Sequence, residues 1–258
     1  MKTQLVEFNS SNNEILRGIL INDHDFNSEK IVIMLGGFER AGSTEHKFKL
    51  LSDYLAQQKI ASLRFDVADC GLSDGDFYNL TVQSMADDLS QAVTYVKSLG
   101  YSQISVVGHS LASCAIALLL DKIDFIKIVL LGPALNQREL LKLWFAQKNN
   151  KDKAINWSNY QQYVSTAEYQ ADLQADMLTK SHLLAAAHRL ANQNLDYGGY
   201  YREFDLSRIL LIQGDADLIV PLPSLTVDFP QQIIVSAGDH GLEKPGMIEQ
   251  WLEPAVKF

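Results

Sequence analysis

The sequence has little cysteine, no excess of basic charge and no long apolar run, and each shortage excludes a class of function. The two cysteines, Cys70 and Cys114, lack the spacing of metal ligands and suit a reducing compartment. Lys and Arg number 22 against 31 Asp and Glu, so the net charge of −9 disfavours a nucleic-acid or anionic-membrane partner. The longest apolar run, residues 114–120, is too short to span a bilayer.

The start of the chain and its composition favour a soluble enzyme-sized domain. Glu7 stands where a signal peptide needs apolar residues, so we expect a cytoplasmic protein with no membrane span. Hydrophobic residues at 47% and charged residues at 21% are typical of a globular chain with a substantial core. At 258 residues, one large domain with an insertion is the first expectation.

Short apolar runs alternate with longer helical patterns, which predicts an α/β fold with a mostly parallel, twisted central sheet flanked by helices. The first two runs are separated by turn residues, which predicts a hairpin. Apolar residues at steps of three and four predict an amphipathic helix over 82–99, a run that is apolar nearly all round predicts a buried helix over 111–120, and a last helix is expected near 244–256. The predicted strands are 3–8, 15–21, 31–35, 60–65, 104–107, 128–131, 209–212 and 232–235.

The stretch between the strands at 128–131 and 209–212 is too long for a single crossover connection. We therefore predict that residues 136–205 form an inserted, mostly helical cap, and that residues 1–135 and 206–258 form the core. Six of the ten tyrosines fall in this cap, together with Trp144, Phe145 and Trp157. They either build the cap's own core, which is the simpler interpretation, or form a wall for an aromatic or acyl group.

A candidate nucleophile lies where the strand at 104–107 meets the buried helix, in the segment Gly108-His109-Ser110-Leu111-Ala112. A serine held on a sharp strand-to-helix turn needs small neighbours two residues away on each side, because larger side chains would collide with the backbone. The turn also puts Ser110 at a helix N-terminus, which favours negative charge nearby. A plain helix-capping serine would show the same pentapeptide about as often.

Serine needs a base, and the base needs an orienting acid. Of the six histidines, only His240 follows the last predicted strand, in a loop between Gly238 and Gly241. Asp215 and Asp217 follow the strand at 209–212, and either fits the acid position on spacing alone. Each signal is weak by itself, but the chain order Ser, Asp, His at strand ends is that of a hydrolase triad.

With these motifs in hand, the chain resembles an α/β-hydrolase fold serine hydrolase over nearly its full length outside the cap. Gly108 to Ala112 resembles the nucleophile elbow, Gly214-Asp215-Ala216-Asp217 the acid turn, and Gly238-Asp239-His240 the histidine loop. The resemblance implies Ser110, Asp217 and His240 as the catalytic residues. Arg64-Phe65-Asp66 and the Gly-Leu-Ser-Asp-Gly of 71–75 resemble the feruloyl or cinnamoyl esterase-like branch.

The resemblance also implies an oxyanion hole made by the backbone N–H groups of Leu111 and Phe38. Two positions depart from the family pattern: Ala112 stands where glycine is usual, and Gly36-Gly37 replaces the usual His-Gly. The Gly-Gly loop is similar to that of hydrolases encoded beside exosortase systems, so both branches stay open. The resemblance assigns Asp66 a structural role in anchoring its loop.

These observations predict a serine hydrolase that cleaves carboxylic esters through an acyl-enzyme intermediate. Acyl transfer or thioester cleavage would use the same residues, and a non-catalytic small-ligand-binding protein on the same fold is the alternative of another class. We expect a small-molecule ester or acyl substrate, no cofactor and no metal. Neither a Gly-x-Gly-x-x-Gly fingerprint nor a Gly-Lys-Ser/Thr ending occurs, so nucleotide binding is not supported.

Overall fold

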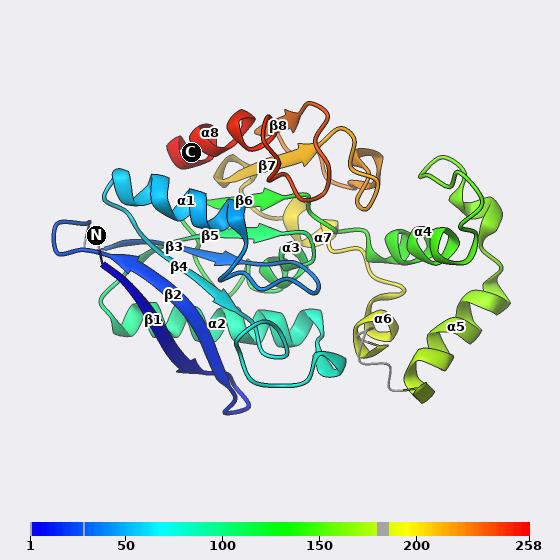
Figure 1. Cartoon of the computed structure of the whole chain (residues 1–258), viewed down its shortest axis with the longest axis horizontal. Coiled ribbons are helices and arrows are strands. Elements are labelled where there is room, and N and C mark those ends of the chain that lie inside the picture. The colour runs from blue at the N-terminus through cyan, green and yellow to red at the C-terminus, as the bar shows by residue number, and fades with distance from the viewer. Residues whose placement is uncertain (1, 28, 180–185) are drawn as a thin grey trace.

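The computed structural model describes all residues except 1, 28 and 180–185, and it contains one eight-stranded sheet (Figure 1). The strands lie side by side in the order β1-β2-β4-β3-β5-β6-β7-β8. Their bounds are β1 Lys2–Asn9, β2 Ile15–Asn22, β3 Lys30–Leu35, β4 Ala61–Asp66, β5 Gln103–His109, β6 Ile128–Leu131, β7 Ile209–Gly214 and β8 Gln232–Val235.

The strand directions confirm the predicted α/β-hydrolase fold. β2 is antiparallel to both β1 and β4, and every later pairing from β4 to β8 is parallel. The predicted hairpin is therefore correct, with Leu5 opposite Ile19 and Phe8 opposite Leu16. Because the six parallel strands all point the same way, the loops that follow them meet at one edge of the sheet.

Helices cover both faces of the sheet (Figure 1). One face packs against α1 and α8, whose Phe48, Leu55 and Trp251 are fully or almost fully buried there. The other face packs against α2 and α3, with Met85, Leu89 and the rest of a larger apolar cluster. The helices are α1 His46–Gln57, α2 Val82–Ser98, α3 Ala112–Ala117, α4 Gln137–Asn149, α5 Thr166–Thr179, α6 Ala186–Asn192, α7 Gly198–Arg202 and α8 Leu252–Lys257.

Two helices are shorter than the sequence pattern predicts. The buried helix ends at Ala117 because the chain tightens there: the N–H of Leu119 donates to the carbonyl of Ile116, three residues back. The last helix begins only at Leu252. Pro245 and Gly246 precede it, and Gly246 has a φ of 85°, a backbone conformation that an α-helix does not contain.

The long connection between β6 and β7 contains α4, α5, α6 and α7. Figure 1 shows α4, α5 and α6 beyond the ends to which the parallel strands point. These helices have small apolar clusters of their own, one around Leu140 and Tyr160 and another around Phe145 and Tyr169. Part of the aromatic content thus packs within this segment, as the simpler interpretation expected. Residues 180–185 of the expected cap lie outside the described residues.

The loop after β4 is held by a buried carboxylate. The Asp66 side chain, which has no exposed surface, accepts hydrogen bonds from the backbone N–H of Ser43 at 2.8 Å and of Leu72 at 2.9 Å, and from the Ser43 hydroxyl at 2.8 Å. These contacts match the anchoring role expected for Asp66. In the described part of the chain, no helix combines the length and the apolar character that a membrane crossing needs.

Asp88, on the buried face of α2, is predicted to make the stability of the fold depend on pH. Burial raises the pKa of this carboxyl to about 7, although its Oδ2 accepts a hydrogen bond from the Ala68 N–H at 2.7 Å. Between about pH 4 and pH 7 the folded chain keeps a proton that the unfolded chain releases, so stability falls as pH rises through this window. We expect Asp88→Asn to raise the free energy of unfolding at pH 8 by about 1–3 kcal/mol and to change it little at pH 4.

Urea titrations at the two pH values measure this effect. Asp87→Asn is the matched control because Asp87 is the next residue on the same helix and only half-buried. Equal effects of Asp88→Asn at both pH values would contradict the prediction.

Candidate active site

The turn between β5 and α3 presents Ser110 in a strained backbone conformation. Ser110 has a φ of 54°, in the left-handed region that residues with a side chain rarely adopt. Its N–H donates to the Leu131 carbonyl at 2.8 Å, and its own carbonyl accepts from the Ala134 N–H at 3.2 Å, so the neighbouring loop holds the turn. A Cβ at Gly108 would lie 2.5 Å from Cδ1 of Ile116, which explains the small residue there.

The structure brings the three predicted catalytic side chains together. The Ser110 hydroxyl lies 2.9 Å from Nε2 of His240, and Nδ1 of His240 lies 2.8 Å from Oδ2 of Asp217. A carboxylate only accepts, so Nδ1 carries the proton in neutral His240 and Nε2 is left as the acceptor for the serine proton. The order of hydrogen bonding therefore runs from Ser110 through His240 to Asp217.

Asp217, and not Asp215, faces the histidine. The Asp217 side chain has no exposed surface, and its Oδ1 accepts from the N–H groups of Ile219 at 2.9 Å and Val220 at 2.8 Å. Asp215 is exposed on the same turn. The choice that spacing left open is thus resolved by geometry in favour of the residue that the resemblance indicated.

Gln213 also holds Asp217, and the sequence reasoning missed it. Its Nε2 donates to Oδ2 of Asp217 at 3.1 Å and to the Val220 carbonyl at 2.9 Å, and the residue is completely buried. The available signal was a lone amide in β7, a strand whose other residues before Gly214 are all aliphatic. A buried polar side chain must find partners, so its position directly before the acid turn pointed to the site.

Close backbone contacts bring the acid turn and the histidine loop together. A Cβ at Gly214 would lie 2.2 Å from the Gly238 carbonyl oxygen, and a Cβ at Gly132 would lie 3.2 Å from Nδ1 of His240. Gly132 also has a φ of 52°. Any side chain at these glycines would push the loop that carries His240 away from Ser110.

The backbone N–H groups of Phe38 and Leu111 face no acceptor within the described part of the chain. The Phe38 loop packs directly on the elbow: a Cβ at Gly37 would lie 2.8 Å from Cβ of Ser110 and 3.1 Å from the His109 carbonyl. Gly37, a position where the family pattern also has glycine, therefore permits this close approach. Two free donors beside a serine are the arrangement that an oxyanion hole requires.

His109 supports the histidine loop from behind. Its Nε2–H donates to the His240 carbonyl at 2.8 Å, and the two rings lie 4.9 Å apart between centroids. Burial, together with the nearby Lys47, moves the pKa of His109 well below its ordinary value, so the ring is neutral. This contact gives His109 a structural role beside the site.

A cavity of about 140 Å³ opens next to Ser110. Its apolar walls come from Phe38 and Leu111 on the core and from three side chains of α4. Lys148, His188 and Arg189 add polar groups to the wall. The α4 residues are Leu141, Trp144 and Phe145. Part of the aromatic content between β6 and β7 thus does face the serine, which the simpler interpretation did not expect.

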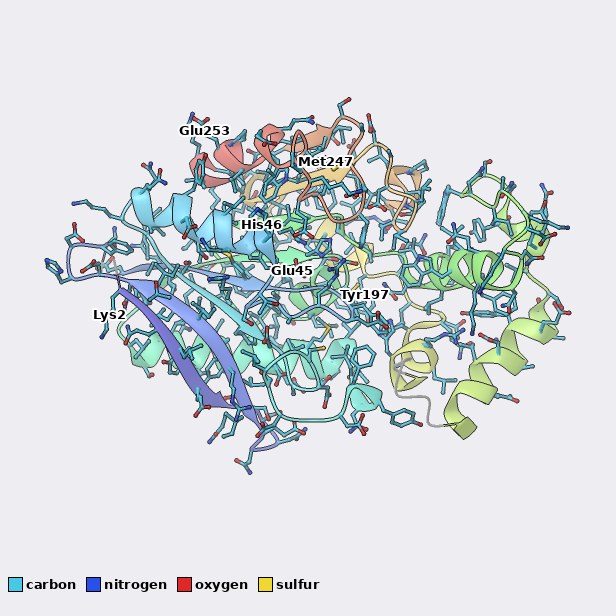
Figure 2. All side chains as sticks on the ribbon, viewed as in Figure 1. Lys2, Glu45, His46, Tyr197, Met247 and Glu253 are labelled. Carbon is cyan, nitrogen blue, oxygen red and sulfur yellow. The ribbon has the colours of Figure 1, made fainter. Side chains whose placement is uncertain are left out.

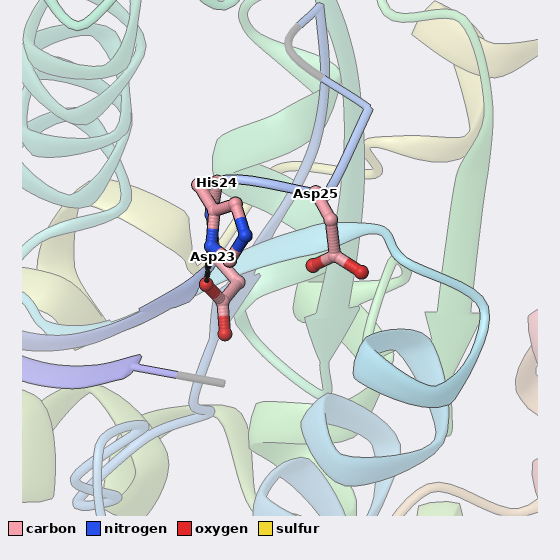
Figure 3. Close-up of side chains that lie close together, drawn as sticks. All are labelled: Asp23, His24 and Asp25. Carbon is pink, nitrogen blue, oxygen red and sulfur yellow. Dashed lines mark hydrogen bonds and ion pairs between the residues drawn. The ribbon is translucent and has the colours of Figure 1, made fainter.

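Two other groups of side chains that can be reactive or bind metal make no hydrogen bond to Ser110, His240 or Asp217. Cys70 and Cys114 are buried free thiols, and burial raises the pKa of Cys70 to about 12. Among the described residues, Asp23, His24 and Asp25 are the three metal-ligand side chains that lie close together (Figure 3). They follow β2 at the sheet edge opposite Ser110, and their charges are engaged: Nδ1 of His24 with Asp23, and Asp25 with Lys59.

The sheet order and the elbow turn define the class of this protein, an α/β hydrolase. Residues 27–226 match the family described as serine aminopeptidase, S33, and the chain belongs to that family. No curated protein matches the sequence.

Solved structures with the same fold include several esterases. Est1E from Butyrivibrio proteoclasticus, solved with ferulic acid bound, has a TM-score of 0.73 at 19% identity, covering 98% of this chain and 96% of its own. The Pyrococcus furiosus esterase PF2001 has a TM-score of 0.71 at 17% identity, covering 99% and 90%. The esterase EaEST from Exiguobacterium antarcticum has a TM-score of 0.67 at 14% identity, covering 98% of each chain.

The close packing of Gly37 on the elbow yields a testable prediction. Gly37→Ala places a methyl group against Ser110, so the loop must withdraw and take the Phe38 N–H with it. We expect the rate at which a fluorophosphonate probe labels Ser110 to fall about 10²-fold, because a shift of about 1 Å in a reacting site costs that much. Gly199→Ala is the control, since a Cβ there meets nothing within 4 Å. Equal labelling rates in wild type and Gly37→Ala, with both chains folded, would refute the prediction.

Proposed function

We propose that this protein is a serine esterase that hydrolyses carboxylic esters through an acyl-enzyme intermediate. The observation that carries the proposal is the hydrogen-bonded series from Ser110 through His240 to Asp217, whose direction the buried carboxylate fixes. The esterase names of the structural neighbours agree with it. A protein that only binds a ligand has no need for all three groups in this order.

In the proposed reaction, Ser110 Oγ attacks the ester carbonyl while His240 Nε2 takes the hydroxyl proton. Negative charge develops on the carbonyl oxygen, where the Phe38 and Leu111 N–H groups stabilise it, each worth about 10²–10³ in rate. His240 then protonates the leaving alkoxide, which departs and leaves the acyl group on Ser110. Water, activated by the same imidazole, releases the acid. Asp217 holds the ring orientation and stabilises the imidazolium throughout.

The cavity beside Ser110 is proposed to hold the acyl group. The leaving oxygen must lie within reach of His240 Nε2, yet neither His240 nor Asp217 lines the cavity. The cavity instead borders the residues of the two proposed oxyanion donors, Phe38 and Leu111. At about 140 Å³ it is close in size to an apolar cavity of about 150 Å³ that holds benzene, so we infer an acyl group of about ring size.

The charges around the cavity favour an ester over a peptide with a free amino terminus. Among the residues that the structure describes, the charged side chains that line it are Lys148 and Arg189, both cationic. An aminopeptidase must bind the ammonium group of its substrate, which a carboxylate in the wall would stabilise and two cations repel. The carboxylate nearest them, Asp172, pairs with Lys148 at 3.2 Å and with Arg189 at 2.7 Å.

We also propose that residues 136–205 act as a cap over the site. The support is that α4 and α6 supply most of the cavity wall, including Trp144 and His188. In this arrangement the sheet edge carries the reacting groups and the helices between β6 and β7 select the substrate.

Ester hydrolysis with loss on substitution of the triad tests the proposal. Wild type is expected to hydrolyse p-nitrophenyl butanoate with little turnover of L-leucine p-nitroanilide. Ser110→Ala and His240→Ala are each expected to lower kcat by about 10³-fold or more, because the nucleophile or its base is lost. Ser102→Ala and His24→Ala serve as controls, since both residues are exposed. Turnover that survives in Ser110→Ala, or a wild type that acts on neither substrate, would overturn the proposal.

Gln213 offers a test of how Asp217 is held. Gln213→Leu keeps the approximate size of the side chain but removes the donor to Asp217 Oδ2. We expect kcat for p-nitrophenyl butanoate to fall about tenfold with KM little changed, since one hydrogen bond to a charged group is worth about 1.5–3 kcal/mol. Steady-state kinetics measure both constants, and Gln213→Glu is unsuitable because it would add a second carboxylate. A change in KM alone would count against this role.

A further inference from the structure

A buried histidine in the wall of the cavity has one ring nitrogen without a partner. His188, on α6, is 3% exposed, and its ring lies 5.4 Å from that of Phe38 between centroids. Its Nδ1 lies 3.1 Å from Nδ2 of Asn192, one helical turn further on. Its Nε2 makes no hydrogen bond to any described residue. A ring nitrogen in a cavity wall with no partner among the described residues can bind a ligand, and the neighbouring groups decide whether it donates or accepts.

Asn192 fixes which nitrogen of His188 carries the proton. The Asn192 Nδ2 lies 2.7 Å from the His188 carbonyl oxygen, which can only accept, so this end of the amide is the donor. The other end of the amide, Asn192 Oδ1, then accepts from the Tyr197 hydroxyl at 2.6 Å. Nδ1 of His188 must therefore accept from Asn192, which leaves the proton on Nε2. Tyr197, labelled in Figure 2, lies where the chain passes from α6 towards α7.

The surroundings also keep the ring uncharged. Burial lowers the pKa of His188 to about 4, so the imidazole is neutral at ordinary pH. Lys148 and Arg189 line the same cavity, and their positive charge opposes a second proton on the ring. Because Nδ1 faces Asn192, which does not line this cavity, Nε2–H is the edge that the ring turns towards it.

We propose that His188 is a specificity-determining residue whose Nε2–H donates a hydrogen bond to an acceptor oxygen on the acyl group, so that the preferred esters carry a carbonyl or ether oxygen beyond an apolar segment. The inference rests on the proposed function, because it assigns the cavity to the acyl group. The cavity wall between Ser110 and His188 is apolar, so the first part of the chain meets Phe38, Leu111 and α4. Beyond that part it reaches His188, whose Nε2–H is a neutral donor, unlike the cationic Lys148 and Arg189 of the same wall.

Matched pairs of esters test this assignment without altering shape. The p-nitrophenyl esters of 4-oxopentanoate, 5-oxohexanoate and 6-oxoheptanoate are each compared with the analogue in which the keto C=O is replaced by C=CH2. This analogue keeps the planar shape but has no acceptor oxygen at that position. At one chain length we expect wild type to favour the keto ester by about tenfold in kcat/KM, the size of one good hydrogen bond. His188→Phe keeps a ring in the wall without a donor, and we expect it to reduce that ratio to about one.

Two further variants separate a direct contact from a structural effect. His188→Gln keeps an N–H donor and is expected to retain part of the preference. Phe145→Leu changes the size of the cavity, and we expect it to alter both members of each pair alike. Thermal unfolding checks that every variant is folded.

The outcomes distinguish the two proposals. If wild type hydrolyses p-nitrophenyl butanoate but shows a ratio near one at every chain length, or if His188→Phe keeps the wild-type ratio, the role of His188 is wrong and the esterase proposal stands. If folded wild type hydrolyses none of the esters, both fail.

Discussion

The arrangement of the site depends on the buried carboxylate of Asp217. A charge with no exposed surface is tolerated only when donors surround it, and here two backbone N–H groups, an amide and an imidazole do so. Because the carboxylate can only accept, it determines the tautomer of His240, and through it the direction in which the Ser110 hydroxyl points its proton. The Asp217 carboxylate thus determines which group donates and which accepts in each hydrogen bond from Ser110 through His240 to Asp217.

Small residues are the second constraint, because the three catalytic candidates come from loops that must nearly touch. Gly37 packs on the elbow, Gly132 leaves room for the His240 ring, and Gly214 lies against Gly238. Ser110 itself takes a left-handed conformation, which costs energy that the hydrogen bonds of the turn offset. At these positions the chain loses local stability, and in return the loops that carry Ser110, Asp217 and His240 can lie close together. The buried strands and α2 supply the apolar packing that holds the sheet together.

Much of the fold and of the site was predictable because both leave local patterns. Period-two alternation located the first two strands and short apolar runs located the other six, two of them, β6 and β8, with the observed bounds. The elbow and the two downstream loops located Ser110, Asp217 and His240. Helix ends were less predictable, since tight hydrogen bonding after Ala117 and the Pro245-Gly246 pair act over a few residues. Gln213 and His188 were not predicted because the role of each depends on a side-chain contact that the folded backbone creates. Gln213 contacts Asp217, four residues further on, and His188 contacts Asn192, one helical turn further on.

The cavity draws its floor and its walls from different parts of the chain. Ser110, Leu111 and Phe38 belong to the loops that follow β5 and β3, whereas Trp144, Phe145 and His188 belong to helices between β6 and β7. The described residues of these helices make no direct hydrogen bond to the side chains of Ser110, His240 or Asp217, and their nearest link is Trp144 Nε1, which donates to the Ile219 carbonyl just after the acid turn. In the proposed function, substitutions elsewhere on these helices therefore change which substrate is accepted more than they change the reacting groups. In the proposed function, related proteins that keep the residues at the sheet edge and differ in these helices can therefore act on different substrates by the same chemistry.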